Sequence, residues 1–461
     1  MPDTMQKRTF TLLDTAASTT NAAAATPRLG RFAVPGRTPI STPNYIPVTS
    51  RGAIPHLSPD VGAEHADVRG VYAGFEDFIE RSRHPTPPIY TTPMPTPTSS
   101  RLRTFMSLPS STLLILGPRR VPPVPCPTPS SATSLTIMSS DGYRQLATEA
   151  YIDAIRRLRP DIVVGMADLD ACVTGDAVKK LYGSSSETTA VAEKSGEVEK
   201  GAVDSLYFAP ILPLDASRQQ LYTRDLATEY AQHISGFAIY DSDTVDAIPA
   251  SLSSLPRLAL TNPRTPQEIL RSIVQGVDIL TAPFANAASD AGIALAFTFP
   301  ASISGPENEV EVKESEKMPL AVDMWPAYHA ADMSPLTKNC GCYACTTFSR
   351  AYIRHLLNAK EMLAWSLLQI HNMRVLDDFF AGVRSSIEQG NFDKDVEVFE
   401  RVYQSEMPVQ TGQGPRLRGY QFKTEKGDGK KNEKVYGRLD DAVKKFGGEE
   451  ESKAEGEIGV N

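Results

Sequence analysis

The chain has 461 residues, a hydrophobic content of 41% and a formal net charge of −8. This length allows one large domain or two to three ordinary ones, and the overall charge gives no sign of a nucleic-acid binder, although a local basic face would suffice for phosphate contacts. The chain lacks a run of about 20 apolar residues, so no membrane-spanning helix is expected. It also lacks the apolar core of a signal peptide, so a cytoplasmic location is expected.

The first part of the chain is rich in turn-forming residues. Residues 1–27 are predicted to be a flexible N-terminus, and residues 28–57 contain short extended runs separated by glycine and proline, which is typical of strands and turns. Residues 84–130 are rich in proline, serine and threonine. We predict that they form an excursion outside the core, interrupted by one strand-like run from Leu113 to Leu116.

From residue 134 the pattern alternates between strand and helix. Ser134 to Met138 resembles a strand, Tyr143 to Leu158 has helical spacing, and residues 161–166 resemble a buried strand just before Asp168. An acidic insert at 183–202 is predicted to be solvated. Further strands are predicted at residues 206–212, 236–239, 257–260, 278–283 and 292–297, and helices at 217–232 and 266–275.

This alternation predicts an α/β domain with parallel strands, either a barrel or a doubly wound sheet. The chain has neither a G-x-G-x-x-G after a strand nor a Walker loop, which disfavours nucleotide-cofactor folds. In a barrel, the residues that follow the strands form the active face. Here they include Asp168, Tyr240, Asp241 and Thr281, each of which, taken alone, is more commonly an ordinary loop residue.

Three thiols lie within six residues, at Cys340, Cys342 and Cys345, and His371 follows on a predicted helix. Cysteine and histidine are the preferred ligands of tetrahedral structural zinc. A straight helix would carry His371 about 39 Å from Cys345, so we predict a reversal near Asn358 that returns the histidine to the thiols. The alternatives are reduced thiols or a disulfide, but an odd total of five cysteines disfavours a disulfide framework.

Beyond the cysteine motif, the stretch CGCYACTTFSRAYIRHLLNAKEMLAWSLLQIHN resembles the zinc subdomain of tRNA-guanine transglycosylases, which share CxCxxC, RAY and HN at this spacing. Weaker similarity extends upstream through RLGRF, LRPDIVVGMADLD and TPQEILRSIVQGVDIL. The resemblance implies a (β/α)8 TIM-like barrel over 28–325, and a zinc subdomain with closing helices over 326–400. Residues 401–461 are predicted to be a mostly disordered charged tail.

In that family an aspartate attacks the ribose C1′ of guanosine 34 in tRNA, and this chain departs from the family pattern at the catalytic positions. Thr281 stands at the nucleophile, and Pro283-Phe284-Ala285-Asn286 replaces the PTR that follows. Leu212 stands at the pocket glutamine and Tyr240-Asp241 at paired glycines, while DSGGFQ, with the second catalytic aspartate, is absent. Only Asp168 stands at an aspartate position that helps to recognise the base, so we expect no catalytic residue.

An intact zinc motif beside a changed catalytic site resembles the non-catalytic branch of the family. That branch pairs with a catalytic queuine tRNA-ribosyltransferase subunit, and the heterodimer places queuine at wobble position 34 of tRNAs with GUN anticodons. The resemblance therefore implies a heterodimer, one structural zinc ion per chain and tRNA bound through the complex. The complex is expected in the cytoplasm or peripherally on the mitochondrial outer membrane.

Two alternatives remain open. One is a self-sufficient base-exchange enzyme with a relocated nucleophile, Asp278 or Asp241, although strand parity points Asp278 away from the face of Thr281. The other is a zinc-stabilised RNA-binding scaffold. The basic residues of the zinc-side helices form either an ordinary solvated face or a phosphate-contacting strip. They are Arg350, Arg354, Lys360, Arg374 and Arg384.

Overall fold

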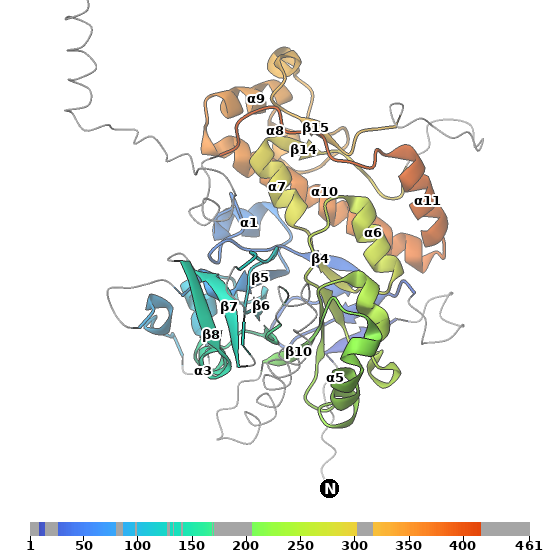
Figure 1. Cartoon of the computed structure of the whole chain (residues 1–461). Coiled ribbons are helices and arrows are strands. Elements are labelled where there is room, and N and C mark those ends of the chain that lie inside the picture. The colour runs from blue at the N-terminus through green and yellow to red at the C-terminus, as the bar shows by residue number, and fades with distance from the viewer. Residues whose placement is uncertain are drawn as a thin grey trace, which may run out of the picture. The chain divides into compact units, whose positions relative to one another are not determined.

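Eight parallel strands form the central sheet of this computed structural model (Figure 1). A parallel bridge between Val48, which follows β4, and Tyr72 of β5 joins the two edges, so the sheet nearly closes into a barrel. The predicted (β/α)8 class is thereby confirmed. In order around the sheet, the strands are β4 (Asn44–Ile46), β13 (Ile279–Thr281), β12 (Arg257–Ala259), β11 (Gly236–Ile239), β10 (Leu206–Ile211), β9 (Ile162–Val164), β6 (Leu113–Gly117) and β5 (Gly70–Gly74).

The structure describes residues 9–13, 26–79, 86–96, 99–126, 130–131, 133–139, 142–167, 169, 205–301 and 317–415. Several positions discussed above lie outside the described residues: Asp168, the acidic insert at 183–202, most of the segment 1–27 and the tail from residue 416.

The barrel strands are buried on both faces, as parallel strands in such folds are. In β6, Leu113 and Ile115 belong to the cluster that fills the barrel interior, whereas Leu114 and Leu116 pack outward in the layer beneath the helices. A small antiparallel sheet contributes Phe10, Phe32 and Ile40 to the interior cluster and so closes the N-terminal end of the barrel. Its strands are β1 (Phe10–Leu12), β2 (Gly30–Phe32) and β3 (Ile40–Thr42).

The covering helices follow from local sequence signals. In α3 (Thr148–Leu158) the buried residues Tyr151, Ala154 and Leu158 recur every three to four positions, which places them on one face. Proline occupies the first turn of α6 (Pro266–Val274) and of α7 (Pro283–Ala291), where its missing N–H costs no hydrogen bond. Among the described residues of this part, the other α-helices are α1 (Pro59–His65), α2 (Arg101–Phe105) and α5 (Ala216–Thr228).

The Pro-rich segment 84–130 is not an excursion from the core, so that prediction was wrong. It supplies the barrel strand β6 and the helix α2, and its Ile89 and Leu102 are buried in the main core. Its many prolines therefore mark turns between packed elements. The strand-like run from Leu113 to Leu116 was the sequence signal for the barrel strand β6.

Two other segments also differ from the sequence-based expectation. Residues 143–147 belong to β8 (Gly142–Ala147), which pairs with β7 (Ser134–Ser139) in an antiparallel hairpin, and the helix begins only at Thr148. The run at 292–297 forms β14 (Ile293–Leu295), which pairs with β15 (Ala321–Asp323) outside the barrel. In both cases the pairing partner decides the structure, because a short strand is stable only beside another strand.

A helical part follows β15 and carries the cysteine motif. It consists of η7 (Ala327–Ala331), α8 (Tyr343–Thr347), α9 (Arg350–Asn358), α10 (Met362–Glu388) and α11 (Phe392–Val402). The chain reverses after Asn358, as predicted, with Lys360 at a φ of 57°. Residues 401–415 are ordered against this part, so the expected disorder does not begin at residue 401. Within the described ranges, no helix is both long and apolar enough to span a membrane.

Candidate metal centre and barrel mouth

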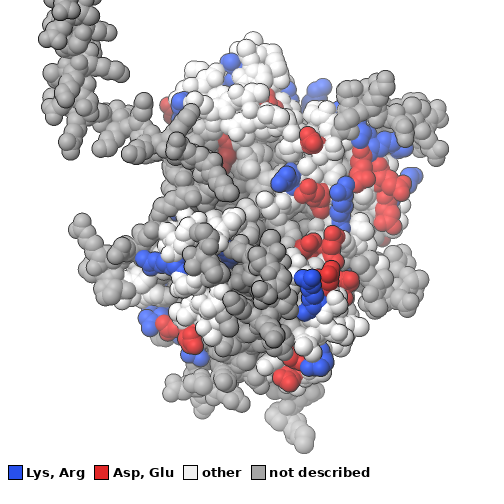
Figure 2. Space-filling view, viewed as in Figure 1, with Lys and Arg blue, Asp and Glu red and all other residues white. Residues whose placement is uncertain are grey.

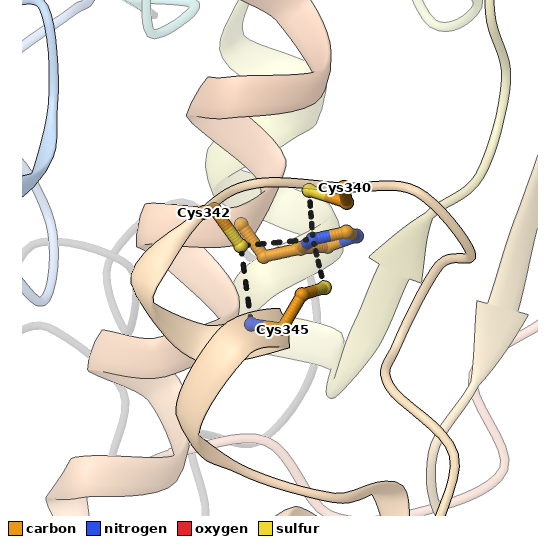
Figure 3. A group of neighbouring side chains, drawn as sticks. Cys340, Cys342 and Cys345 are labelled. Atoms are coloured by element: carbon orange, nitrogen blue, oxygen red, sulfur yellow. Dashed lines mark hydrogen bonds between the residues drawn. The ribbon is translucent and has the colours of Figure 1, made fainter.

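The four side chains predicted as metal ligands lie together. Cys340 precedes α8, Cys342 caps its N-terminus, Cys345 lies in its first turn, and His371 comes from the middle of α10 (Figure 3). The thiol of Cys342 accepts a hydrogen bond from the backbone N–H of Cys345 at 3.3 Å, which is the helix cap itself. The short helix α8 therefore sets the spacing of the CxxC pair.

The separations between these atoms fit tetrahedral zinc. The imidazole Nδ1 of His371 lies 3.6, 3.6 and 3.4 Å from the Sγ atoms of Cys340, Cys342 and Cys345. All four ligand atoms lie within 4.8 Å of one another. Bond lengths of about 2.3 Å for Zn–S and about 2.0–2.1 Å for Zn–N at tetrahedral angles require an S···N distance of about 3.6 Å. The cluster can therefore hold a zinc ion.

The imidazole of His371 is oriented from its other side. Its Nε2 is 2.8 Å from the carbonyl oxygen of Leu295, which accepts the N–H, so in the neutral imidazole the lone pair is on Nδ1, toward the thiols. The adjacent Asn372 accepts a hydrogen bond from the backbone N–H of Leu295 at 2.8 Å. Strand β14 is thus bound to α10 by two consecutive residues. Such outer contacts hold metal-binding histidines in one tautomer.

The close contacts within the cluster shift the pKa values of its thiols and of the imidazole. Burial lowers the pKa of His371, but hydrogen bonds to Cys340 and Cys345 outweigh this effect and raise the pKa to about 9. Hydrogen bonds with the two neighbouring thiols lower the pKa of Cys340, whereas the pKa of Cys342 is raised. The thiol of Cys340 therefore ionises more readily than that of Cys342.

The C-terminal ends of the strands form the mouth of the barrel. Thr281, the last residue of β13, is fully buried, and its hydroxyl donates to the carbonyl oxygen of Thr261 at 2.8 Å. The hydroxyl hydrogen of Thr281 is thus donated to a backbone carbonyl oxygen, which is not a base that could activate the threonine as a nucleophile. In the described part of the chain, the two residues that follow each of β6, β10, β12 and β13 include no carboxylate.

Apolar side chains occupy the adjoining part of the mouth. Leu212, directly after β10, packs with Ala167, Leu214 and the partly buried Leu169 and Tyr240. Burial raises the pKa of Tyr240 above its ordinary value, so the phenol stays neutral. A cluster of this kind offers few donors or acceptors to the edge of a purine.

Tyr72 of β5 covers the end of β6. Its hydroxyl donates to the carbonyl oxygen of Arg119 at 2.6 Å, and a Cβ atom at Gly117 would lie only 1.9 Å from that hydroxyl. Strand β6 therefore ends on a glycine because a tyrosine fills the space. The sequence provided no signal for this contact, because the two residues are brought together only by the pairing of β5 with β6.

Two carboxylates that follow β5, Glu76 and Asp77, serve a buried ion-pair network. Asp77 accepts hydrogen bonds from the Nε and Nη2 of Arg120 at 3.0 and 2.8 Å. Glu76 accepts from the backbone N–H groups of Arg120 and Met138, each at 2.8 Å. Burial raises the pKa of Glu76, and the arginine and these hydrogen bonds oppose that shift. Both carboxylates are thus committed to holding the loop after β6.

Comparison with known proteins agrees with this geometry. A model of the family described as queuine tRNA-ribosyltransferase matches residues 23–405. The chain belongs to the queuine tRNA-ribosyltransferase family. The match ends just after α11, before the segment 406–415 that is still ordered on the helical part.

Three relatives carry the same name, queuine tRNA-ribosyltransferase accessory subunit 2. The protein of Schizosaccharomyces pombe is 34% identical over 385 residues, which are 83% of this chain and 83% of that protein. That of Culex quinquefasciatus is 26% identical over 388 residues, covering 76% of this chain and 81% of its own. That of Xenopus tropicalis is 24% identical over 315 residues, covering 61% and 76%.

The two aspartates considered as relocated nucleophiles are placed unfavourably for that role. Asp278 is fully buried at the N-terminal end of β13, opposite the mouth at which this family's chemistry is expected, and its two oxygens bind Arg28 at 2.8 and 2.5 Å. It also accepts the backbone N–H of Arg257 at 2.7 Å. Asp241 is exposed and caps η4 (Ser242–Ala247) by accepting the N–H of Asp243.

The basic residues of the helical part do not form one free strip. Arg350 donates to the carbonyl oxygens of Pro335 and Leu336, and Arg354 to those of Trp325 and Pro326. Arg374 pairs with Asp378 one turn along α10, and Arg384 donates to the carbonyl oxygen of Pro43. The face shown in Figure 2 likewise intersperses basic and acidic side chains around α6 and α11. Arg350 therefore holds the loop before α8, and Arg354 holds the connection between β15 and η7.

A row of aromatic rings crosses the surface of the helical part, and sequence reasoning missed it. We call it the aromatic row. The ring centroids of neighbours are 4.3, 5.5, 5.6 and 6.4 Å apart. Tyr343 is 39% exposed and Tyr352 42%. The available signal was the three-residue spacing of Tyr352 and His355 on α9, with Phe348 four residues before Tyr352. The row consists of His65, Tyr343, Phe348, Tyr352 and His355.

Proposed function

We propose that this chain is the non-catalytic subunit of a heterodimeric queuine tRNA-ribosyltransferase. In this proposal it pairs with a catalytic subunit of the same family, and the pair exchanges guanine for queuine at wobble position 34 of tRNAs with GUN anticodons. The observation that carries the proposal is the barrel mouth, where Thr281 bonds to a neighbouring strand and Leu212 and Tyr240 lie in an apolar cluster. The names of the relatives support the accessory role. A cytoplasmic location of the complex, or a peripheral one on the mitochondrial outer membrane, belongs to the same proposal.

We further propose that Cys340, Cys342, Cys345 and His371 hold one structural zinc ion per chain. Three thiols and an imidazole fill all four tetrahedral positions, so none is left for substrate. The ion would bind α8, α10 and, through Leu295, β14 into one unit. The ion therefore has no part in the base exchange.

We expect the chain alone to incorporate no radiolabelled guanine or queuine into tRNA, and Thr281→Asp not to restore activity. A carboxylate at position 281 would still face Leu212 and Tyr240 where a purine needs polar partners. Each missing partner costs on the order of 1–3 kcal/mol. The assay compares this chain, a catalytic homologue and the mixture of the two.

Activity of the mixture should depend on the aspartates of the catalytic homologue, and substitution of Thr281 with valine should leave it unchanged. Robust turnover by this chain alone would refute the non-catalytic assignment. The heterodimer is tested separately by purifying this chain with its bound proteins from the native cell. Absence of the catalytic homologue from those proteins would refute the heterodimer.

We propose that the aromatic row is part of the surface that meets the catalytic subunit. Exposed tyrosines in a packed cluster are typical of interface hot spots. Truncation of a hot-spot side chain to alanine costs about 2 kcal/mol or more of binding free energy, and about 1.4 kcal/mol corresponds to a tenfold change in the dissociation constant. Tyr352→Ala should therefore weaken heterodimer formation by about tenfold or more in analytical ultracentrifugation.

Tyr143→Ala is the matched control, because Tyr143 in β8 has nearly the same exposure, 41% against 42%, but lies outside the row. Equal dissociation constants for the two variants would remove the aromatic row from the interface and leave the non-catalytic assignment untouched.

A further inference from the structure

The segment after α11 returns across the helical part instead of leaving it. Its start pairs with the residues before β15, since the N–H of Met318 donates to the carbonyl oxygen of Val402 and the N–H of Gln404 to that of Met318, at 2.8 and 2.9 Å. Farther on, the hydroxyl of Thr411 donates to the carboxylate of Asp323 in β15. In Figure 1 the segment runs from α11 past β14 and β15 toward α9.

The far end of the segment is anchored at the helical reversal and at α7. Lys360, in the turn between α9 and α10, donates to the side-chain oxygen of Gln413 at 3.0 Å. Gly414 approaches the end of α7 so closely that a Cβ atom there would lie 2.9 Å from the carbonyl oxygen of Asp290. The segment thus bridges β15, α7 and the α9–α10 turn.

The centre of this contact is the indole of Trp325. Its Nε1 donates to the carbonyl oxygen of Ala291 at 2.8 Å. A Cβ atom at Gly292 would lie 2.4 Å from the indole nitrogen, and one at Gly412 would lie 2.0 Å from the ring. The ring is therefore held between two glycines, one ending α7 and the other in the returning segment. Gly292 also needs its φ of 77° to end the helix.

Two structural links connect the contact around Trp325 with the candidate metal ligands. Trp325 and Asp323 hold β15, which pairs with β14 through Ile293↔Asp323 and Leu295↔Ala321. The carbonyl oxygen of Leu295 then fixes the imidazole of His371. Displacing the returning segment therefore loosens the strand that orients the fourth ligand.

We propose that residues 404–415 form a strap that holds β15 against β14 and thereby positions the imidazole of His371. The inference does not depend on the proposed base exchange. Its hydrogen-exchange test concerns contacts within this chain alone, whereas its cobalt test rests on the proposed metal site. It makes Gly412 and Trp325 positioning residues for the metal cluster.

The first test compares two truncations of the full chain. The variant ending at residue 415 keeps the whole strap, whereas the variant ending at residue 407 loses Thr411, Gly412 and Gln413. Hydrogen exchange at residues 291–296, 321–325 and 340–347 should match the full chain in the first variant. It should be faster by about tenfold or more in the second. Exchange in β5 and β6 serves as the internal reference and should not change.

The second test is Gly412→Val in the full chain, with Val409→Ser as control, because Val409 lies in the same segment and is 84% exposed. The cobalt-substituted Gly412→Val protein should show shifted d–d absorption bands and faster loss of the metal to a chelator, whereas the control should match the wild type. Unchanged exchange in the variant ending at residue 407, or unchanged bands in Gly412→Val, would overturn the proposal, as would exchange that rises equally in the barrel strands.

Discussion

Cys342→Ser is expected to leave the protein largely insoluble. Cys342 has the smallest exposed fraction of the three thiols, 4%, and it both caps α8 and faces Nδ1 of His371. A serine hydroxyl does not ionise near neutral pH and binds zinc poorly, so the variant loses one of four ligands. Because metal binding by such sites is worth about 10–16 kcal/mol and is coupled to folding, a large part of the stability of the helical part is lost with it.

The measurements are the soluble fraction on expression and the zinc content of the purified wild type by elemental analysis. Cys126→Ser is the matched control, since Cys126 is half-buried and lies outside the cluster. It should remain soluble with unchanged zinc content. Less than half an equivalent of zinc in the wild-type chain would contradict the assignment, as would a fully soluble Cys342→Ser protein with its full zinc content.

Asp278→Ala is expected to lower the free energy of unfolding by about 3–5 kcal/mol, because it removes the carboxylate bound to the guanidinium of Arg28 and leaves that group with the carbonyl oxygens of Ser253 and Leu255. The side chains of Asp278 and Arg28 are 0% and 14% exposed, so water has little access to the space that the lost carboxylate leaves. With an unfolding entropy of about 2.1 cal/mol/K per residue, this loss corresponds to a fall of roughly 3–5 °C in Tm for a chain of this size. Differential scanning calorimetry measures it.

Asp241→Ala is the control, because Asp241 is also an aspartate near a strand end but is exposed and only caps η4. Its loss should cost about 1 kcal/mol or less. A stable Asp278→Ala protein whose complex has lost base exchange would instead indicate that Asp278 acts in catalysis.

Local sequence signals were sufficient for several elements. Buried strands such as Ile162–Val164 and Ile279–Thr281 stand out as short apolar runs, and α6 is marked by Pro266 in its first turn. They failed for Gly142–Ala147, because the helix-like spacing of this run is overridden by pairing with β7. They failed also for the barrel strand β5, a five-residue run whose alternation is hidden because both of its faces are buried.

The sequence by itself determined the set of candidate metal ligands and the residue types at the barrel mouth. The spacing of Cys340, Cys342 and Cys345 already implies a thiolate knuckle, and the chemical identity of Thr281 and Leu212 does not depend on the fold. These are properties of neighbouring residues or of single side chains.

Only the tertiary structure decided which groups surround them. The carbonyl oxygen of Leu295 that orients His371 lies 76 residues away in the chain, and Gly412 meets Trp325 only after α11 has reversed the path. His65 likewise joins the aromatic row from α1. Such contacts depend on backbone position and on the space left by other side chains, and neither is encoded in local residue patterns.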